Sequence, residues 1–124
     1  MRSQPGRIVV VDDDHVMRTL LDMHLRNAGY EVFIAEDAVE GGHLIMKVLP
    51  DLIICDVDMP YLNGYEFVAA LKTHDTTRAI PVVFLTSNED LDGATSRLGA
   101  AAHLTKPVRA DRLLEVVERF ARKP

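Results

Sequence analysis

Short runs of apolar residues alternate along the chain with longer segments in which apolar residues recur at helical spacing. The run 8–11 is β-branched and continuous, which is typical of a strand buried on both faces of a parallel sheet. Similar runs follow at 32–34, 52–55 and 82–85, and a fifth, weaker one lies at 103–104. This pattern predicts five strands.

The intervening segments predict five helices. Asp14 and Asp37 stand where helix N-caps are expected, and Gly29 stands where the first helix should end. We expect the first helix before Gly29, the second between Asp37 and Pro50, and the third after the turn that ends at Gly64. The last two should span about 90–98 and 110–122. Strands alternating with helices in this way form a doubly wound α/β fold, a parallel sheet covered on both faces.

Length and composition narrow the class of protein. The 124 residues, 48% hydrophobic and 27% charged, suit one domain spanning 1–124 with a core of its own. Cys55 is the single cysteine, so an internal disulfide is excluded. A net charge of −5 argues against direct nucleic-acid binding, and no apolar run approaches the length of a membrane span. We therefore expect a cytoplasmic protein without a membrane partner.

Polar residues with complementary chemistry follow the predicted strands. Asp12 and Asp13 come after the first strand, Asp56 after the third, Thr86 after the fourth and Lys106 after the fifth. The carboxyl ends of parallel strands meet at one edge of the sheet, where ligands of such folds bind. Clustered carboxylates repel one another unless a cation lies among them, and Mg²⁺ prefers oxygen ligands. With a lysine and a hydroxyl beside them, these groups predict a phosphoryl-transfer site with Asp56 as the nucleophile.

Four motifs in order carry a resemblance to a known family. They are Val-Val-Val-Asp-Asp-Asp ending at Asp14, Asp-Val-Asp-Met-Pro beginning at Asp56 with Gly64 beyond, Leu-Thr-Ser around Thr86, and Lys106-Pro107. Together they resemble the receiver domains of two-component response regulators, over about residues 7–122. The resemblance implies a flavodoxin-like (βα)5 fold with strand order 2-1-3-4-5.

The same resemblance implies a role for each acidic residue. Asp56 is similar to the phosphoacceptor, which is also a metal ligand. Asp13 corresponds to a residue that contacts Mg²⁺ directly, and Asp12 to one that acts mostly through water. The backbone carbonyl of Asp58 corresponds to a further ligand, and Mn²⁺ is an alternative to Mg²⁺ in this site.

Roles are also implied for residues around the phosphoryl group. Thr86 corresponds to the switch hydroxyl, Lys106 to the lysine that pairs with the phosphoryl group, and Pro107 to a proline after a cis peptide bond. His103 stands where the family usually has tyrosine or phenylalanine, so the switch is altered. Asp58 and Asn88 occupy the two variable positions that tune how long the acyl phosphate persists.

The implied partners are a sensor histidine kinase or a histidine phosphotransfer protein. Phosphorylation would switch the surface of helix 4, strand 5 and helix 5 toward a downstream protein target or an output domain missing from this chain. The implied activity is that of a signalling phosphoacceptor, not an enzyme: autophosphorylation with small donors and slow self-dephosphorylation.

Two other functions share parts of the pattern. Asp56-Val-Asp58 also resembles the nucleophile motif of haloacid-dehalogenase-type phosphatases. In those enzymes Thr or Val stands where this chain has Pro60, and their second acidic pair follows the lysine instead of preceding the nucleophile. A flavin carrier of similar fold would need a phosphate-binding loop after the first strand, where three aspartates would repel a phosphate.

Overall fold

The computed structural model describes residues 6–57, 59, 64–87 and 99–121. Its elements, in chain order, are β1 (Arg7–Val11), α1 (His15–Asn27), β2 (Glu31–Ala35), α2 (Ala38–Val48), β3 (Leu52–Asp56), α3 (Gly64–Lys72), β4 (Val82–Thr86), β5 (Ala102–Thr105) and α5 (Ala110–Phe120). The helix expected at about 90–98 lies outside the described residues. Among those residues, no helix is both long and apolar enough to cross a membrane.

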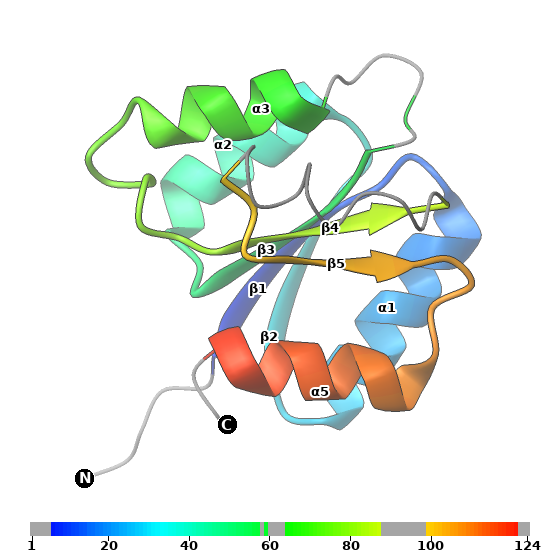
Figure 1. The fold of residues 1–124 in the computed structure, drawn as a ribbon. Helices are drawn as coiled ribbons and strands as arrows, with labels where there is room; N and C mark the ends of the chain where they lie inside the picture. Colours follow the sequence, from blue (N-terminus) through cyan, green and yellow to red (C-terminus); the bar gives the residue numbers. More distant parts are fainter. Residues whose placement is uncertain (1–5, 58, 60–63, 88–98, 122–124) are drawn as a thin grey trace, which may run out of the picture.

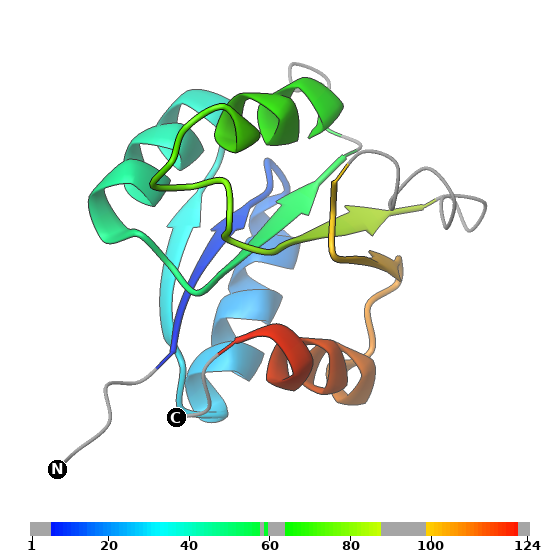
Figure 2. The same cartoon turned by 60° about the vertical axis from the view of Figure 1, so that its left-hand side comes forward.

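The strands form one parallel sheet in the order β2-β1-β3-β4-β5, which confirms the expected fold (Figure 1). Helices α2 and α3 cover one face, and α1 and α5 cover the other (Figure 2). Strand β5 has four residues, whereas the sequence indicated two. Partly buried Ala102 and Thr105 at its ends are not bulky aliphatic residues, so the apolar signal was short.

Alternation along the strands divides the interior into two cores. Ile8 and Val10 of β1 belong to the core shared with α1 and α5, whereas Val9 and Val11 belong to the core beneath α2 and α3. Successive strand side chains point to opposite faces, so a continuous apolar run supplies both cores. The sheet is thereby buried between its helices and holds the strand ends in register.

Both predicted N-caps are present. Asp14 Oδ1 accepts hydrogen bonds from the backbone amides of Val16 and Met17, at 3.0 and 3.4 Å. Asp37 Oδ1 accepts one from the amide of Glu40 at 2.8 Å. Each cap replaces a backbone partner that the first turn of a helix lacks, so these aspartates set where α1 and α2 begin.

Candidate functional site

Three carboxylates meet at the carboxyl edge of the sheet. In the register of the two central strands, Val11 of β1 lies opposite Cys55 of β3, so the next residues, Asp12 and Asp56, emerge side by side. Each of Asp12, Asp13 and Asp56 has an oxygen within 4.8 Å of an oxygen of the other two. Asp12 and Asp56 are buried, whereas Asp13 is exposed. Two carboxylates of the cluster are therefore shielded from solvent, and the third, that of Asp13, is accessible to it.

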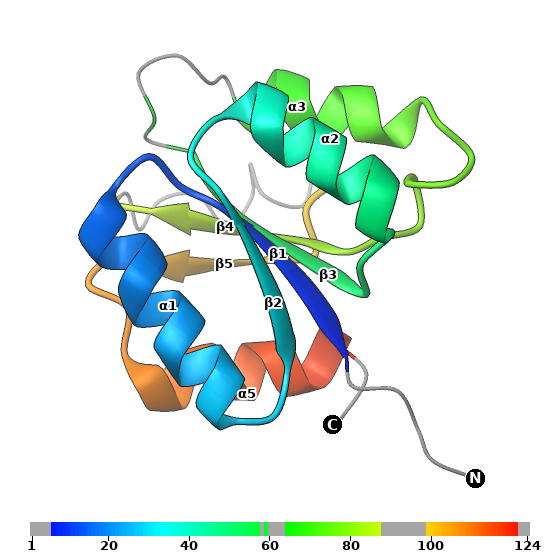
Figure 3. The ribbon, with the colours of Figure 1, turned by 180° about the vertical axis from the view of Figure 1, so that it is seen from behind.

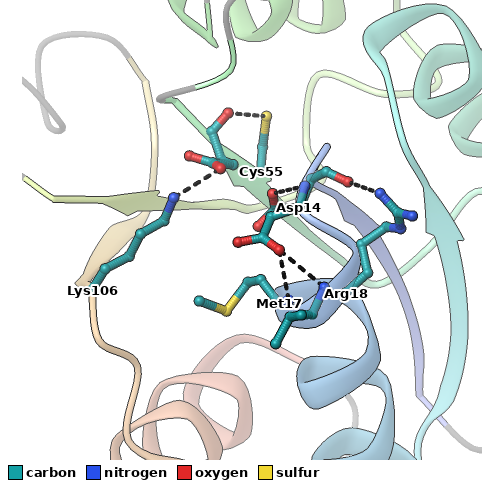
Figure 4. A network of polar contacts seen from close by, with 8 residues as sticks. Asp14, Met17, Arg18, Cys55 and Lys106 are labelled. Atoms are coloured by element: carbon teal, nitrogen blue, oxygen red, sulfur yellow. Dashed lines mark hydrogen bonds and ion pairs between the residues drawn. The ribbon is translucent and has the colours of Figure 1, made fainter.

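Asp12 accepts two hydrogen bonds, one from the turn after β1 and one from α1. Figure 4 labels the donors, Asp14 and Arg18. The backbone amide of Asp14 donates to Asp12 Oδ1 at 2.9 Å. Arg18, one turn into α1, donates from Nη1 to the backbone carbonyl of Asp12 at 2.8 Å, and its side chain is 12% exposed. Arg18 was not among the residues predicted for the site, although its position one turn after the acidic run is a signal for such a role.

The second carboxylate oxygen of Asp12 is the least well compensated polar atom described in the cluster. Asp12 Oδ2 is buried and has no hydrogen-bond partner among the described residues. Burial, and then the charge of Asp56, raises the pKa of the Asp12 carboxyl to about 7, although the amide of Asp14 and the charge of Lys106 oppose this rise. An unpaired buried carboxylate oxygen is costly, so the site favours a proton or a cation at this position.

Lys106 extends from the end of β5 to the cluster. Its Nζ donates to Asp56 Oδ2 at 2.8 Å, and the two side chains are 23% and 3% exposed (Figure 4). Its backbone amide donates to the carbonyl of Thr86 at 2.8 Å, which ties the turn after β5 to the end of β4. The Lys106–Pro107 peptide bond is cis. Two residues 50 positions apart thus form an ion pair in a largely buried setting.

Thr86 and His103 lie on the neighbouring strands. Thr86 is fully buried at the end of β4. His103 of β5 is opposite Phe84 of β4, is partly buried, and lines a cavity of about 240 Å³ together with Arg109 and Arg112. His103 therefore borders this cavity, which Arg109 and Arg112 line from the start of α5.

The sequence also drew attention to Asp58, Asn88 and Cys55. Asp58 and Asn88 fall outside the described residues. Cys55 is buried in the core beneath α2 and α3, as its alternation with Asp56 predicts, and its Sγ donates to the carbonyl of Asp56 at 3.6 Å. Burial, and then the charges of Asp56 and Asp12, raises the pKa of this thiol to about 12. A thiol that stays protonated is a poor nucleophile, so its role is in packing.

Comparison with known proteins shows which family this chain belongs to. The model of the response regulator receiver domain family matches residues 8–118. The chain belongs to this family. It is 36% identical over 121 residues to the response regulator MprA of Mycobacterium sp. (strain KMS), covering 96% of this chain and 52% of that protein. It is 34% identical over 114 residues to protein PilH of Pseudomonas aeruginosa, covering 90% of this chain and 94% of that protein.

The fold agrees with this membership. The chemotaxis response regulator CheY4 of Vibrio cholerae superposes with a TM-score of 0.88 at 31% identity, over 94% of this chain and 99% of that one. The chain spans about half the length of several curated relatives that it matches. It is a two-component receiver domain, a module of phosphorelay signalling. This membership gives no support to the haloacid-dehalogenase alternative.

Proposed function

We propose that Asp56 accepts a phosphoryl group from the phosphohistidine of a sensor histidine kinase or a histidine phosphotransfer protein. The observation that carries the proposal is the buried Asp56 carboxylate, paired with Lys106 at 2.8 Å and flanked by Asp12 and Asp13. An Asp56 oxygen would form the new bond to phosphorus as the phosphorus–nitrogen bond of the donor breaks. The electron pair of that bond leaves with the imidazole, and the product is an acyl phosphate on Asp56.

The acidic cluster fits a divalent cation. Asp12 Oδ2 is buried without a partner among the described residues, and the oxygens of Asp12, Asp13 and Asp56 lie within 4.8 Å of one another. Hard oxygen donors of this kind suit Mg²⁺, with Mn²⁺ as the alternative. We propose these three residues and the backbone carbonyl of Asp58 as its ligands. When bound, the ion supplies positive charge that offsets the charge of the incoming phosphoryl oxygens.

Solved structures of the same fold contain a related case. The receiver domain of the sensor histidine kinase PA1611 from Pseudomonas aeruginosa superposes with a TM-score of 0.84 at 24% identity. That protein holds a magnesium ion in its active-site cleft. In the present chain, the carboxylates of Asp12, Asp13 and Asp56 support Mg²⁺ as the ligand.

Lys106 and Thr86 are the other two protein groups expected to act on the phosphoryl group. Lys106 holds one Asp56 oxygen by a charge-assisted hydrogen bond, which orients the carboxylate and places a positive charge next to the acceptor. Thr86 is the last residue of β4, next to β3. In the register of these two strands Leu85 lies opposite Asp56, so Thr86 follows directly after the partner of Asp56. We propose that its hydroxyl binds the phosphoryl group once this group is present. Groups held in place in a buried site stabilise charge without reorganising during transfer.

We propose that the signal leaves through β5 and α5. A Thr86 hydroxyl drawn toward the phosphoryl group would free space for His103, which lines the cavity beside Arg109 and Arg112. The rest of the expected output surface, helix 4, falls outside the described residues, and the tuning roles of Asp58 and Asn88 stay predictions. Adding beryllofluoride and Mg²⁺ should shift the NMR resonances of the His103 ring; unchanged resonances in a labelled protein would contradict the switch.

The surface of α1 supports a protein as the phosphoryl donor. Val16, Leu20 and Met23 are exposed along one side of this helix and line an apolar hollow of about 320 Å³ together with His15. Because α1 begins directly after the acidic turn, a helix of the donor packed there would bring its phosphohistidine near Asp56. Replacing Leu20 by serine should slow transfer from the donor protein but not from acetyl phosphate.

The phosphoacceptor is tested by labelling. With acetyl phosphate and Mg²⁺, mass spectrometry should find one phosphoryl group, on Asp56, and the Asp56→Asn variant should stay unmodified. Asp75→Asn is the matched control, since Asp75 is exposed and its carboxylate pairs with Arg78 away from the site. A phosphoryl group on a histidine or a serine would refute the assignment.

A further inference from the structure

Arg18 connects the start of α1 to the ends of two strands. Its Nη1 donates to the backbone carbonyl of Asp12, after β1, at 2.8 Å, and its Nη2 lies 3.8 Å from Glu36 Oε2, after β2. Figure 3 shows the N-terminal end of α1 and the carboxyl end of β2 at the same edge of the sheet. Arginine side chains are mostly exposed unless they are paired, so these contacts account for the low exposure of Arg18.

The carbonyl that Arg18 binds belongs to the peptide unit between Asp12 and Asp13. The carbonyl of one residue and the amide of the next lie in one plane, because the peptide bond has partial double-bond character. A fixed Asp12 carbonyl therefore also fixes the direction in which the main chain enters Asp13. The chain before this unit is held as well, since the Asp12 amide donates to the carbonyl of Ala35 at 3.1 Å.

The carboxylate of Asp13 depends on its main chain more than that of Asp12 does. The Asp12 carboxylate is buried and accepts from the Asp14 amide at 2.9 Å. The Asp13 side chain is exposed, and within the described part of the chain no hydrogen bond or ion pair holds it. It nevertheless has an oxygen within 4.8 Å of oxygens of Asp12 and Asp56. Its place in the cluster therefore depends on the peptide unit that Arg18 orients.

We propose that Arg18 is a positioning residue, which holds Asp13 where it can bind the metal ion. This inference rests on the proposed Mg²⁺ site. The charge of Arg18 acts in the opposite direction, because a cation near the cluster repels Mg²⁺. Loss of that charge alone would tighten Mg²⁺ binding, whereas loss of the hydrogen bond to the Asp12 carbonyl would weaken it. The sign of the change therefore distinguishes the two effects.

The first experiment measures Mg²⁺ binding by calorimetry. Arg18→Met should raise the dissociation constant of Mg²⁺ at least about tenfold, which is typical for loss of a group that orients a metal ligand. Arg26→Met is the matched control. Arg26 is also on α1, and its Nη2 also donates to a backbone carbonyl, that of Val32, at 2.7 Å. This control removes the same charge from the same helix, and it should leave the Mg²⁺ dissociation constant unchanged.

The outcomes of this experiment separate the positioning role from the metal site itself. A wild type that binds no Mg²⁺ would overturn the proposed metal site, and the role of Arg18 with it. If the wild type binds Mg²⁺ and Arg18→Met binds it equally well or more tightly, only the positioning role is overturned. An equal loss of affinity in Arg18→Met and Arg26→Met would also overturn that role, because it would show a general effect of altering α1.

The second experiment separates the hydrogen bond from the charge. Arg18→Lys keeps a positive charge and N–H donors on a flexible side chain. If Arg18 acts through the Asp12 carbonyl, Arg18→Lys should bind Mg²⁺ more tightly than Arg18→Met does. Charge alone predicts the reverse order, since only the lysine variant keeps a cation near the cluster. A lysine variant that binds Mg²⁺ no more tightly than Arg18→Met would overturn the proposal.

The third experiment needs no metal. In EDTA, the amide nitrogen resonance of Asp13 should shift in Arg18→Met, because the carbonyl of the same peptide unit loses its hydrogen bond. The same resonance should stay in place in Arg26→Met. An Asp13 resonance that is unchanged in both variants would overturn the proposal.

Discussion

Replacing Asp12 with asparagine should stabilise the metal-free protein, and the gain should be larger at pH 8 than at pH 5. The variant keeps the side-chain oxygen that accepts from the Asp14 amide at 2.9 Å. It replaces Oδ2, which is buried without a partner among the described residues, by a neutral group. The substitution therefore removes the unpaired charge at nearly constant volume.

The magnitude follows from the raised pKa. In the folded protein the pKa of Asp12 is about 7, compared with an ordinary value of 3.8, chiefly because of burial. Between these values the folded state binds more protons at Asp12 than the unfolded chain does, so the free energy of unfolding falls as pH rises through this window. Above pH 7 the full cost is present. At 1.36 kcal/mol per pKa unit this cost is on the order of 4 kcal/mol.

The assay is urea unfolding followed by far-ultraviolet circular dichroism, since the chain has no tryptophan. Wild type and Asp12→Asn are compared in EDTA at pH 5, 6, 7 and 8, and the difference between them isolates Asp12 from the other groups that titrate in this range. Asp75→Asn, at an aspartate whose side chain is 89% exposed, should differ from the wild type by less than about 0.5 kcal/mol throughout. A difference between wild type and Asp12→Asn that stays constant from pH 5 to pH 8 would refute the reasoning.

Three further predictions concern Mg²⁺ binding, the ion pair of Lys106 with Asp56, and the two adjacent glycines of α2. Mg²⁺ at about ten times its dissociation constant should add ~1.4 kcal/mol to the wild-type free energy of unfolding at pH 8, and Asp13→Asn should abolish most of this gain in urea titrations. Lys106→Met leaves the Asp56 charge without its 2.8 Å partner, so it should destabilise the metal-free protein by about 1–3 kcal/mol while tightening Mg²⁺ binding in calorimetry. Gly41→Ala places a Cβ 2.8 Å from a buried β1 side chain and should cost about 1–3 kcal/mol in thermal unfolding, whereas Gly42→Ala should stabilise by about 0.5–1 kcal/mol.

Several features could be predicted from the sequence because they depend on neighbours along the chain. The β-branched run 8–11 is a buried strand, and Asp14 and Asp37 cap their helices, as predicted. The alternation of side chains correctly placed Cys55 in the core. Once the strands were taken as parallel, the convergence of Asp12 and Asp56 at one edge followed from the position of each after its strand.

Other features were decided by the tertiary structure, because they depend on distances between segments far apart in sequence. Asp12 Oδ2 has no partner among the described residues, and Arg18 donates to the Asp12 carbonyl, because of how α1 and the turn before it pack on the sheet. Gly41 and Gly42 are adjacent and chemically identical, yet one lies against β1 and the other faces open space. Sequence periodicity assigns such residues to an element; the packing of that element against the sheet determines which atoms they meet.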